Sequence, residues 1–238
     1  MRMARGMLPA VAMALALVGV SPSMSHGAGH SVTLFAGVFG NDEFVQVWEG
    51  VAGSYAVHDR VSLVGRITGV HYLDSSRFRE GDSGIGEAGV GVLVAPRTTV
   101  TILGGSYFGD IEDPIIDGWV STSQLIAGHW FQLNVGALYG FDSERWQTWN
   151  SLSTPITDTA KDLILFGGVE SVIYSEGELW DGGDFVHNSD KDDVRYRVGP
   201  FLELYKRSWD AGVRVGVGGG DYGVYGSGQI YKRFGFGS

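Results

Sequence analysis

The chain of 238 residues contains no cysteine. This absence excludes a disulfide framework and a thiolate metal site. It also excludes a lipoprotein, because no thiol is present to be acylated. Basic residues are scarce as well, since 17 Lys and Arg stand against 27 Asp and Glu. Nucleic-acid phosphates require Lys and Arg, so we expect no nucleic-acid partner.

Long apolar runs are also missing, and the one short run lies in a typical targeting segment. Arg2 and Arg5 precede an uncharged run over residues 7–20, and residues 21–29 are small and polar. The run is shorter than the roughly 20 residues of a transmembrane helix, so a cleaved signal peptide is favoured over an uncleaved anchor. We predict a signal peptide over residues 1–29 and a single domain over residues 30–238.

Most of the remaining sequence alternates apolar and polar residues, and residues 193–207 show this most clearly. One face carries Val194, Tyr196, Val198, Pro200, Leu202 and Leu204, and the other carries Arg195, Arg197, Gly199, Phe201, Glu203, Tyr205 and Arg207. Successive side chains of a strand point to opposite sides. Many such segments without helical periodicity predict an all-β protein. In a secreted chain they favour a barrel with its apolar face toward lipid and its charged face toward the lumen.

The number of strands follows from the connections between them. Eleven alternating segments can be assigned, near residues 31–40, 43–57, 61–74, 84–95, 98–110, 118–129, 130–142, 161–175, 193–207, 211–221 and 223–236. Bacterial single-chain barrels have an even number of strands, and short turns alternate with long loops only if residues 144–152 form another strand. We therefore predict a single antiparallel transmembrane β-barrel of about 12 strands in the outer membrane, with 10 strands as the alternative. Pro200 cannot donate to a ladder, so we expect a bulge there.

The predicted inward faces collect charged residues of both signs. This lumen cluster contains Arg66, Glu87, Glu170, Arg195, Arg197, Glu203, Arg214 and Arg233, with Glu49 as a further candidate. The charges either select a solute in a channel or pair with one another and fill the lumen. Eight-stranded barrels are filled by side chains and open channels appear at about 16–18 strands, so a crowded lumen is favoured.

A second charged set lies in a predicted outer loop. It contains Glu176, Glu178, Asp181, Asp184, Asp190, Asp192 and Asp193, and we assign Asp110, Glu112, Asp113 and Asp117 to the same acidic rim. Hard cations prefer such oxygen ligands, but the spacing of a calcium-binding loop is missing. A solvated loop is therefore favoured, with no metal and no cofactor. An acidic mouth would repel anions and admit cations or neutral sugars.

Catalytic residues are not evident. An outer-membrane hydrolase would need a nucleophile within hydrogen-bond reach of a base. His71 with Ser75, Ser76 or Ser106 is one candidate, and His129 with Ser121 or Ser123 is another. The spacing does not require either group to meet, so we expect no enzyme activity.

The C-terminal segment and the aromatic residues near strand ends indicate membrane partners. Ile230, Phe234 and Phe236 share one face of the last predicted strand, and Lys232 lies among them. Aromatic-rich last strands are typical of chains inserted by the barrel-assembly machinery, which we expect to be a partner along with outer-membrane lipid and lipopolysaccharide. Trp48, Tyr55, Tyr72, Phe108, Trp119, Trp130, Tyr139, Tyr196 and Phe236 are candidates for the interfacial aromatic girdles.

Four segments of the sequence resemble a known group of proteins. They are TLFAGVFGND (residues 33–42), FGGVES (166–171), RVGPF (197–201) and DYGVYGSGQIYKRF (221–234). They resemble small Gram-negative outer-membrane barrels and, among these, the BcsS proteins associated with cellulose biosynthesis. The resemblance implies an accessory role in cellulose or exopolysaccharide production or export, with exopolysaccharide-secretion components as partners. It implies no catalytic residues. A small-solute channel and a lipid-active outer-membrane hydrolase are the alternatives.

Overall fold

A computed structural model describes residues 30–41, 44–75, 82–109, 112–175, 194–221 and 223–236. The predicted signal peptide lies outside the described residues. In the part of the chain that the structure describes, no helix has the length and apolar character needed to cross a bilayer.

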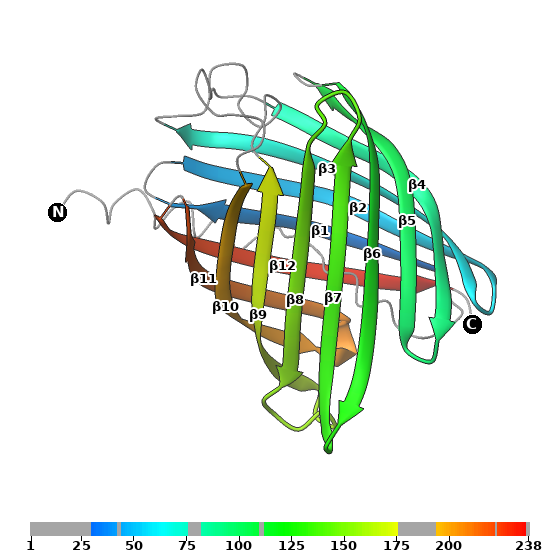
Figure 1. Ribbon diagram of the computed structural model, residues 1–238. Helices are drawn as coiled ribbons and strands as arrows, with labels where there is room; N and C mark the ends of the chain where they lie inside the picture. Colours follow the sequence, from blue (N-terminus) through cyan, green and yellow to red (C-terminus); the bar gives the residue numbers. More distant parts are fainter. Residues whose placement is uncertain are drawn as a thin grey trace.

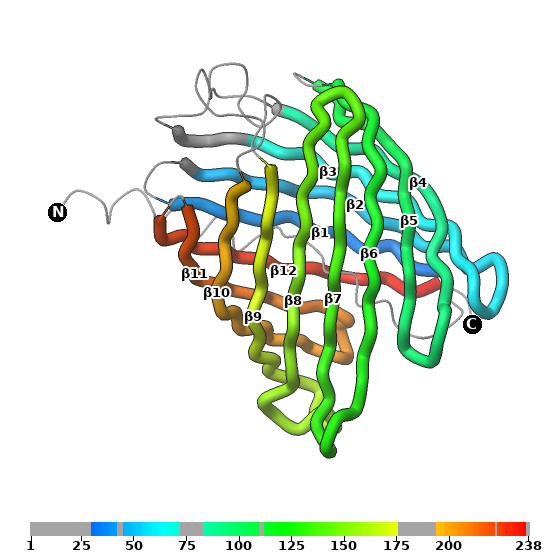
Figure 2. The backbone as a smooth tube through the Cα atoms, in the orientation of Figure 1, coloured from blue at the N-terminus to red at the C-terminus, as the bar shows by residue number. Residues whose placement is uncertain are grey.

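Twelve antiparallel strands form one closed barrel (Figure 1). They are β1 (His30–Gly40), β2 (Phe44–His58), β3 (Val61–Ser75), β4 (Asp82–Ala95), β5 (Thr98–Gly109), β6 (Asp113–Ile126), β7 (His129–Gly140), β8 (Trp146–Pro155), β9 (Leu163–Ser175), β10 (Val194–Lys206), β11 (Ala211–Gly220) and β12 (Gly223–Phe236). Each strand pairs with its neighbours in sequence, and β1 pairs with β12 to close the ring (Figure 2). The predicted fold class is confirmed, including the strand that was inferred only from the even count.

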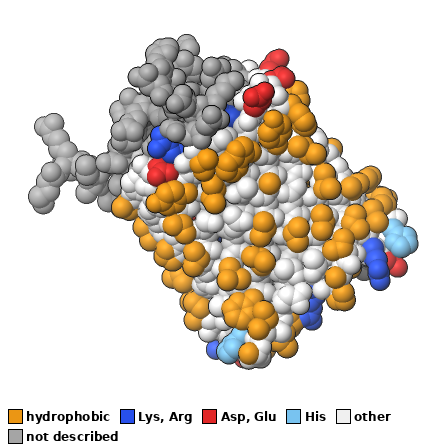
Figure 3. Space-filling view, in the orientation of Figure 1, with side chains coloured by type: hydrophobic (Ala, Val, Ile, Leu, Met, Phe, Trp, Pro, Cys, Tyr) orange, Lys and Arg blue, Asp and Glu red, His pale blue; other side chains and the backbone are white. Residues whose placement is uncertain are grey.

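The outward face of the barrel is apolar. On β10, Val194, Tyr196, Val198, Leu202 and Leu204 are all exposed, whereas Phe201 on the opposite face is 3% exposed. Other strands repeat this pattern, and Figure 3 shows hydrophobic side chains across the wall with charged ones gathered toward its ends. Water would penalise so large an apolar surface, whereas lipid would not.

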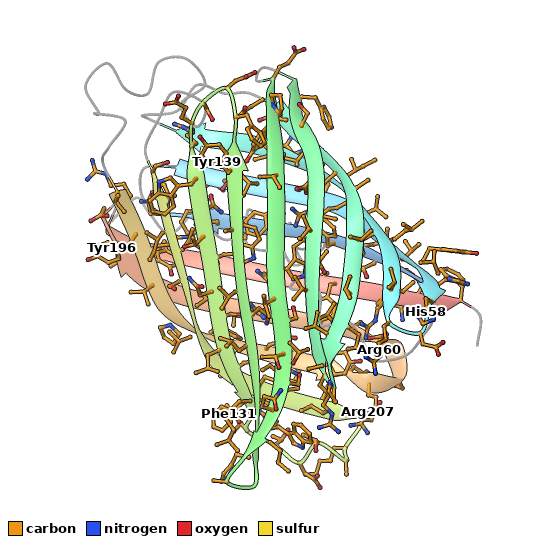
Figure 4. The ribbon with its side chains drawn as sticks, turned by 45° about the vertical axis from the view of Figure 1, so that its right-hand side comes forward. His58, Arg60, Phe131, Tyr139, Tyr196 and Arg207 are labelled. Carbon is orange, nitrogen blue, oxygen red and sulfur yellow. The ribbon has the colours of Figure 1, made fainter. Side chains whose placement is uncertain are left out.

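The two ends of the barrel differ. Short turns join β2 to β3, β4 to β5, β6 to β7 and β10 to β11, the last through a 3-10 helix at Arg207–Trp209, and residues 156–162 join β8 to β9 at the same end. The longest connection, residues 176–193 between β9 and β10, belongs to the opposite end. Figure 4 places His58, Arg60, Phe131 and Arg207 toward this short-turn end, and Tyr139 and Tyr196 toward the opposite, long-loop end. In outer-membrane barrels the short turns face the periplasm.

Strand β6 corrects one predicted loop. We expected residues 111–117 to be an outer loop, but β6 already begins at Asp113. Asp113 and Asp117 are each 1% exposed, so they belong to the barrel wall rather than to an acidic rim. Acidic residues normally indicate a loop, but here alternation with Pro114 and Ile116 turns them into the lumen, where partners compensate their charge.

The bulge expected at Pro200 is absent from the described strand β10. Its ladder with β9 runs through Gly199, Pro200 and Phe201 without a change of register. The ladder with β11 keeps one register from Val198↔Gly219 to Phe201↔Gly216 but omits Gly199 and Pro200. The missing proline N–H is therefore accommodated by a local gap in pairing on one side.

Candidate functional site

The structure places the eight residues of the predicted lumen cluster on the inward face of the barrel. Cross-strand pairs define this face: Arg66 lies opposite Glu87, and Glu203 lies opposite Arg214. Arg195 and Arg197 share the inward parity of Glu203 on β10, Glu170 lies opposite Gly199, and Arg233 lies opposite Thr33. These residues separate into groups rather than one cluster.

The first group, which we call the Arg66 triad, joins β3, β4 and β6. The Nη2 atom of Arg66 lies 2.5 Å from Oε2 of Glu87 and 2.5 Å from Oδ2 of Asp117. Both carboxylate side chains have 0% exposure, and that of Arg66 has 24%. The Arg66 guanidinium also lies 5.7 Å from the ring centroid of Trp119. One cation therefore compensates two fully buried carboxylates.

Gly105 makes room for this triad on the intervening strand. A Cβ atom at Gly105 would lie 2.8 Å from the Glu87 Cγ atom and 2.1 Å from the Gly86 carbonyl oxygen. The Glu87 side chain therefore lies over Gly105 on β5. Asp117 was assigned to the wrong place from the sequence, because it was expected in an outer loop rather than in a strand.

The second group, which we call the Arg214 cluster, joins β9 to β12 on the other side of the lumen. Arg214 Nη2 lies 2.9 Å from Glu203, and Nη1 lies 3.5 Å from Glu170. The Tyr231 hydroxyl donates to Glu203 at 2.7 Å, and Ser227 donates to Glu170 at 3.4 Å. Charge-assisted hydrogen bonds of this kind hold the side chains in fixed positions.

A third pair lies at the short-turn end. Arg233 Nε donates to Asp210 at 2.6 Å, and the Tyr205 hydroxyl donates to the same carboxylate at 2.8 Å. Burial alone would raise the pKa of Asp210, but the hydrogen bonds from Arg233 and Tyr205 outweigh it and the pKa lies below its usual value. Asp210 and Tyr231 are lumen residues that the sequence-based prediction missed, because the first lies in a turn and the second is uncharged.

Aromatic side chains occupy the wall between the charged groups. Trp119 on β6 packs with Val64 and Leu103, and Trp149 on β8 packs against this cluster. Across the lumen, Trp48 packs against Phe39 and Tyr225. The Arg197 guanidinium lies 4.0 Å from the Phe39 ring centroid and 5.8 Å from that of Tyr225. Trp48 and Trp119 therefore line the lumen, and their predicted role in the interfacial girdles is wrong.

A row of uncharged polar groups continues the lining next to Trp149. Ser121 donates to the Asn134 carbonyl oxygen at 2.7 Å, and the Asn134 amide donates to Ser151 at 3.3 Å. These residues lie on β6, β7 and β8 in direct cross-strand register. The lumen thus presents hydroxyls, amides, aromatic rings and paired charges.

Glu49 does not join the lumen cluster. It shares its parity with Val51 and Tyr55, which are exposed on the outer wall, and it lies opposite Gly69. Its Oε1 atom lies 2.8 Å from Nε2 of His71, and the two side chains are 41% and 34% exposed. A hydrogen-bonded acid–base pair therefore faces outward from an otherwise apolar wall.

Two of the candidate catalytic serines, Ser106 and Ser121, have other partners. Ser106 donates to the backbone carbonyl oxygens of Tyr107 and Asp113, and Ser121 donates to Asn134. Ser76 lies outside the described residues. Among the residues that are described, no group of three or more His, Asp and Glu side chains is arranged to hold a metal ion.

The predicted acidic outer loop lies outside the described residues in full. Its members are Glu176, Glu178, Asp181, Asp184, Asp190, Asp192 and Asp193. Its solvation, and its effect on the charge at the mouth of the barrel, remain predictions.

Comparison with known proteins gives the fold but no sequence family. No protein-family profile matches the chain, and no curated protein matches it. The COG4313 outer membrane channel from Pseudomonas putida F1 superposes with a TM-score of 0.56 at 10% identity, over 91% of this chain and 100% of the channel. LpxR from Salmonella typhimurium superposes with a TM-score of 0.51 at 12% identity, over 85% of this chain and 99% of LpxR.

At identities this low, the superpositions show a shared architecture and no more. Because no family profile and no curated protein matches the sequence, the resemblance to BcsS proteins has no support from these comparisons. The similar structures are outer-membrane barrels that each match along their whole length. The closed ring of strands and the apolar outer wall of this chain fit the same environment. The chain is an outer-membrane β-barrel protein.

Proposed function

We propose that this barrel is a narrow channel for small polar solutes that are neutral or cationic. The observation that carries the proposal is the polar lining that strands β3, β4 and β6 to β12 contribute to the lumen. The Arg66 triad and the Arg214 cluster place paired charges on two sides, and the row from Ser121 to Ser151 adds hydroxyl and amide groups. Such a lining replaces water around a polar solute without holding it by an unpaired charge.

The aromatic cluster around Trp119 supports a small size limit. Its members come from β3, β5, β6 and β8, so side chains from four of the twelve strands meet inside the barrel. A barrel of twelve strands is also intermediate between filled eight-stranded barrels and the open channels of about 16–18 strands. The similar fold of an outer membrane channel is consistent with this role.

Permeation through reconstituted barrels tests the proposal. Liposomes that contain the purified protein should swell in small neutral solutes such as glycerol and glucose, and more slowly in larger sugars. Trp119→Ala should accelerate entry of the larger sugars, because it removes one of the two tryptophan side chains of this cluster. Trp146→Ala is the matched control, since Trp146 lies opposite the outward-facing Tyr139. Absence of swelling from correctly folded protein would contradict a channel.

We also propose, from the sequence resemblance alone, an accessory role in cellulose or exopolysaccharide production or export. The segments at residues 33–42 and 166–171 carry this resemblance. Deletion of the gene should then reduce matrix polysaccharide while other outer-membrane proteins stay at normal levels. Unchanged matrix would remove this role and leave the channel proposal intact.

A further inference from the structure

Two tryptophan rings lie over glycines on the inner wall of the barrel. A Cβ atom at Gly37 would lie 2.2 Å from two atoms of the Trp48 ring and 2.7 Å from a third. A Cβ atom at Gly136 would lie 2.3 Å from the nearest Trp149 ring atom and 2.5 Å from two more. Several ring atoms at similar distances mean that each indole lies face-on to its glycine. The other face of each ring is turned away from its glycine. Both tryptophans stay partly exposed, although Trp48 also packs against Phe39 and Tyr225, and Trp149 against Val64, Leu103 and Trp119.

The two rings occupy opposite walls near the same end. Trp48 on β2 lies opposite Gly37 on β1, and Trp149 on β8 lies opposite Gly136 on β7. Strands β2 and β8 are six positions apart in the closed ring of twelve. Both strands start at the long-loop end, and the tryptophans are only four and three residues from those starts. A solute that enters from the long-loop end would therefore pass between them.

Hydrogen-bonding groups flank both rings. Asn134 and Ser151 are paired neighbours of the strand pair that carries Trp149, and they bond to each other at 3.3 Å. Next to the other ring, Gln229 on β12 lies opposite Gly37 in the register. Amides and hydroxyls can both donate and accept, so they suit a ligand whose rim carries hydroxyl groups.

We propose that Trp48 and Trp149 form a saccharide-binding site in the outer half of the lumen. The faces of a pyranose ring carry C–H groups that pack against an aromatic face, while its rim carries hydroxyls that hydrogen-bond to side chains. The site combines both features on each of two opposing walls. This inference rests on the proposed channel and names neutral saccharides as the preferred solutes.

The glycines give the proposal a specific structural test. A methyl group at Gly136 cannot coexist with the present ring position, so Gly136→Ala must displace Trp149 while keeping it in the protein. Trp149→Ala removes the aromatic face, and Trp149→Phe keeps a smaller one. We expect about five- to tenfold weaker saccharide binding for Trp149→Ala and for Gly136→Ala, and a smaller loss for Trp149→Phe.

Binding and permeation are measured separately. Isothermal titration of detergent-solubilised barrel with a neutral glucose tetrasaccharide measures binding without requiring an open lumen. Current block by the same tetrasaccharide in planar bilayers measures passage. Trp146→Ala, on the outward face of the same strand, is the control, and heat-modifiable migration verifies that each variant is folded.

The outcomes separate this inference from the channel proposal. Tetrasaccharide binding that weakens in the Trp48→Ala and Trp149→Ala variants, but not in Trp146→Ala, supports the site even if no current flows. A conducting barrel that does not bind the tetrasaccharide overturns the site and leaves the channel standing. Binding that is unchanged in a folded Trp48→Ala/Trp149→Ala double variant also overturns the site.

Discussion

Replacing Arg66 by methionine should destabilise the barrel more than any exposed charge removal. Methionine keeps much of the side-chain volume but removes the guanidinium that donates hydrogen bonds to both Glu87 and Asp117. Both carboxylate side chains are completely buried. Removing one partner of a buried charge group costs about 3–5 kcal/mol, because the remaining charge is left without compensation.

An exposed ion pair in the same chain provides the comparison for this loss of stability. Lys206 Nζ lies 3.8 Å from Asp162, and the two side chains are 37% and 52% exposed. An exposed pair of this kind contributes about 0–1 kcal/mol, so Lys206→Met should be nearly neutral. Both variants remove one positive charge, but Arg66 compensates two buried carboxylates, whereas Lys206 lies near one exposed carboxylate and the Trp209 ring.

Equilibrium unfolding in urea, followed by tryptophan fluorescence of barrels in phospholipid vesicles, measures the free energies of unfolding. Combining Arg66→Met with Glu87→Gln and Asp117→Asn should restore most of the loss, since the buried charges are then absent. The reasoning is refuted if Arg66→Met costs no more than Lys206→Met. It is also refuted if the triple variant is no more stable than the single one.

Two further perturbations test other parts of the structure. His71→Leu should lower the free energy of unfolding by about 1–2 kcal/mol, because it leaves Glu49 facing lipid without its histidine partner. The double variant Glu49→Leu/His71→Leu should recover this loss. Equal free energies of unfolding for wild type and His71→Leu in vesicles would contradict an outward-facing pair. Asp210→Asn should destabilise the barrel at neutral pH, because a carboxylate with a lowered pKa stabilises the folded state above its unfolded pKa. That advantage over the variant should disappear as the pH falls below about 4 and through the folded pKa, and a pH-independent difference in urea titrations would contradict it.

Alternation was sufficient to predict the architecture where the two faces differ strongly. Strand β10 has aliphatic residues on one face and arginines on the other. Once the chain is expected in the outer membrane, the aliphatic face must be the one that meets lipid. The even strand count identified β8, whose own sequence alternates only weakly. Both inferences depend on local pattern and on closure of the ring, which require no knowledge of pairing register.

Alternation was insufficient in β2, where polarity does not separate the faces. The lumen accepts Trp48 because Gly37 leaves space for its ring, and the outer wall accepts Glu49 because His71 binds it. Hydrophobicity alone therefore suggested that Glu49 faces the lumen and that Trp48 faces the membrane interface. The contact between Arg66 on β3 and Asp117 on β6 crosses the two intervening strands β4 and β5, so only the register of three successive ladders could have predicted it.

Conductance in planar bilayers tests the central claim most directly. Purified barrel, verified as folded, should insert with discrete and small current steps that favour cations over anions. Trp119→Ala should enlarge these steps and Trp146→Ala should leave them unchanged. A folded barrel that inserts without current steps, both as wild type and as Trp119→Ala, would contradict a polar channel constricted at Trp119.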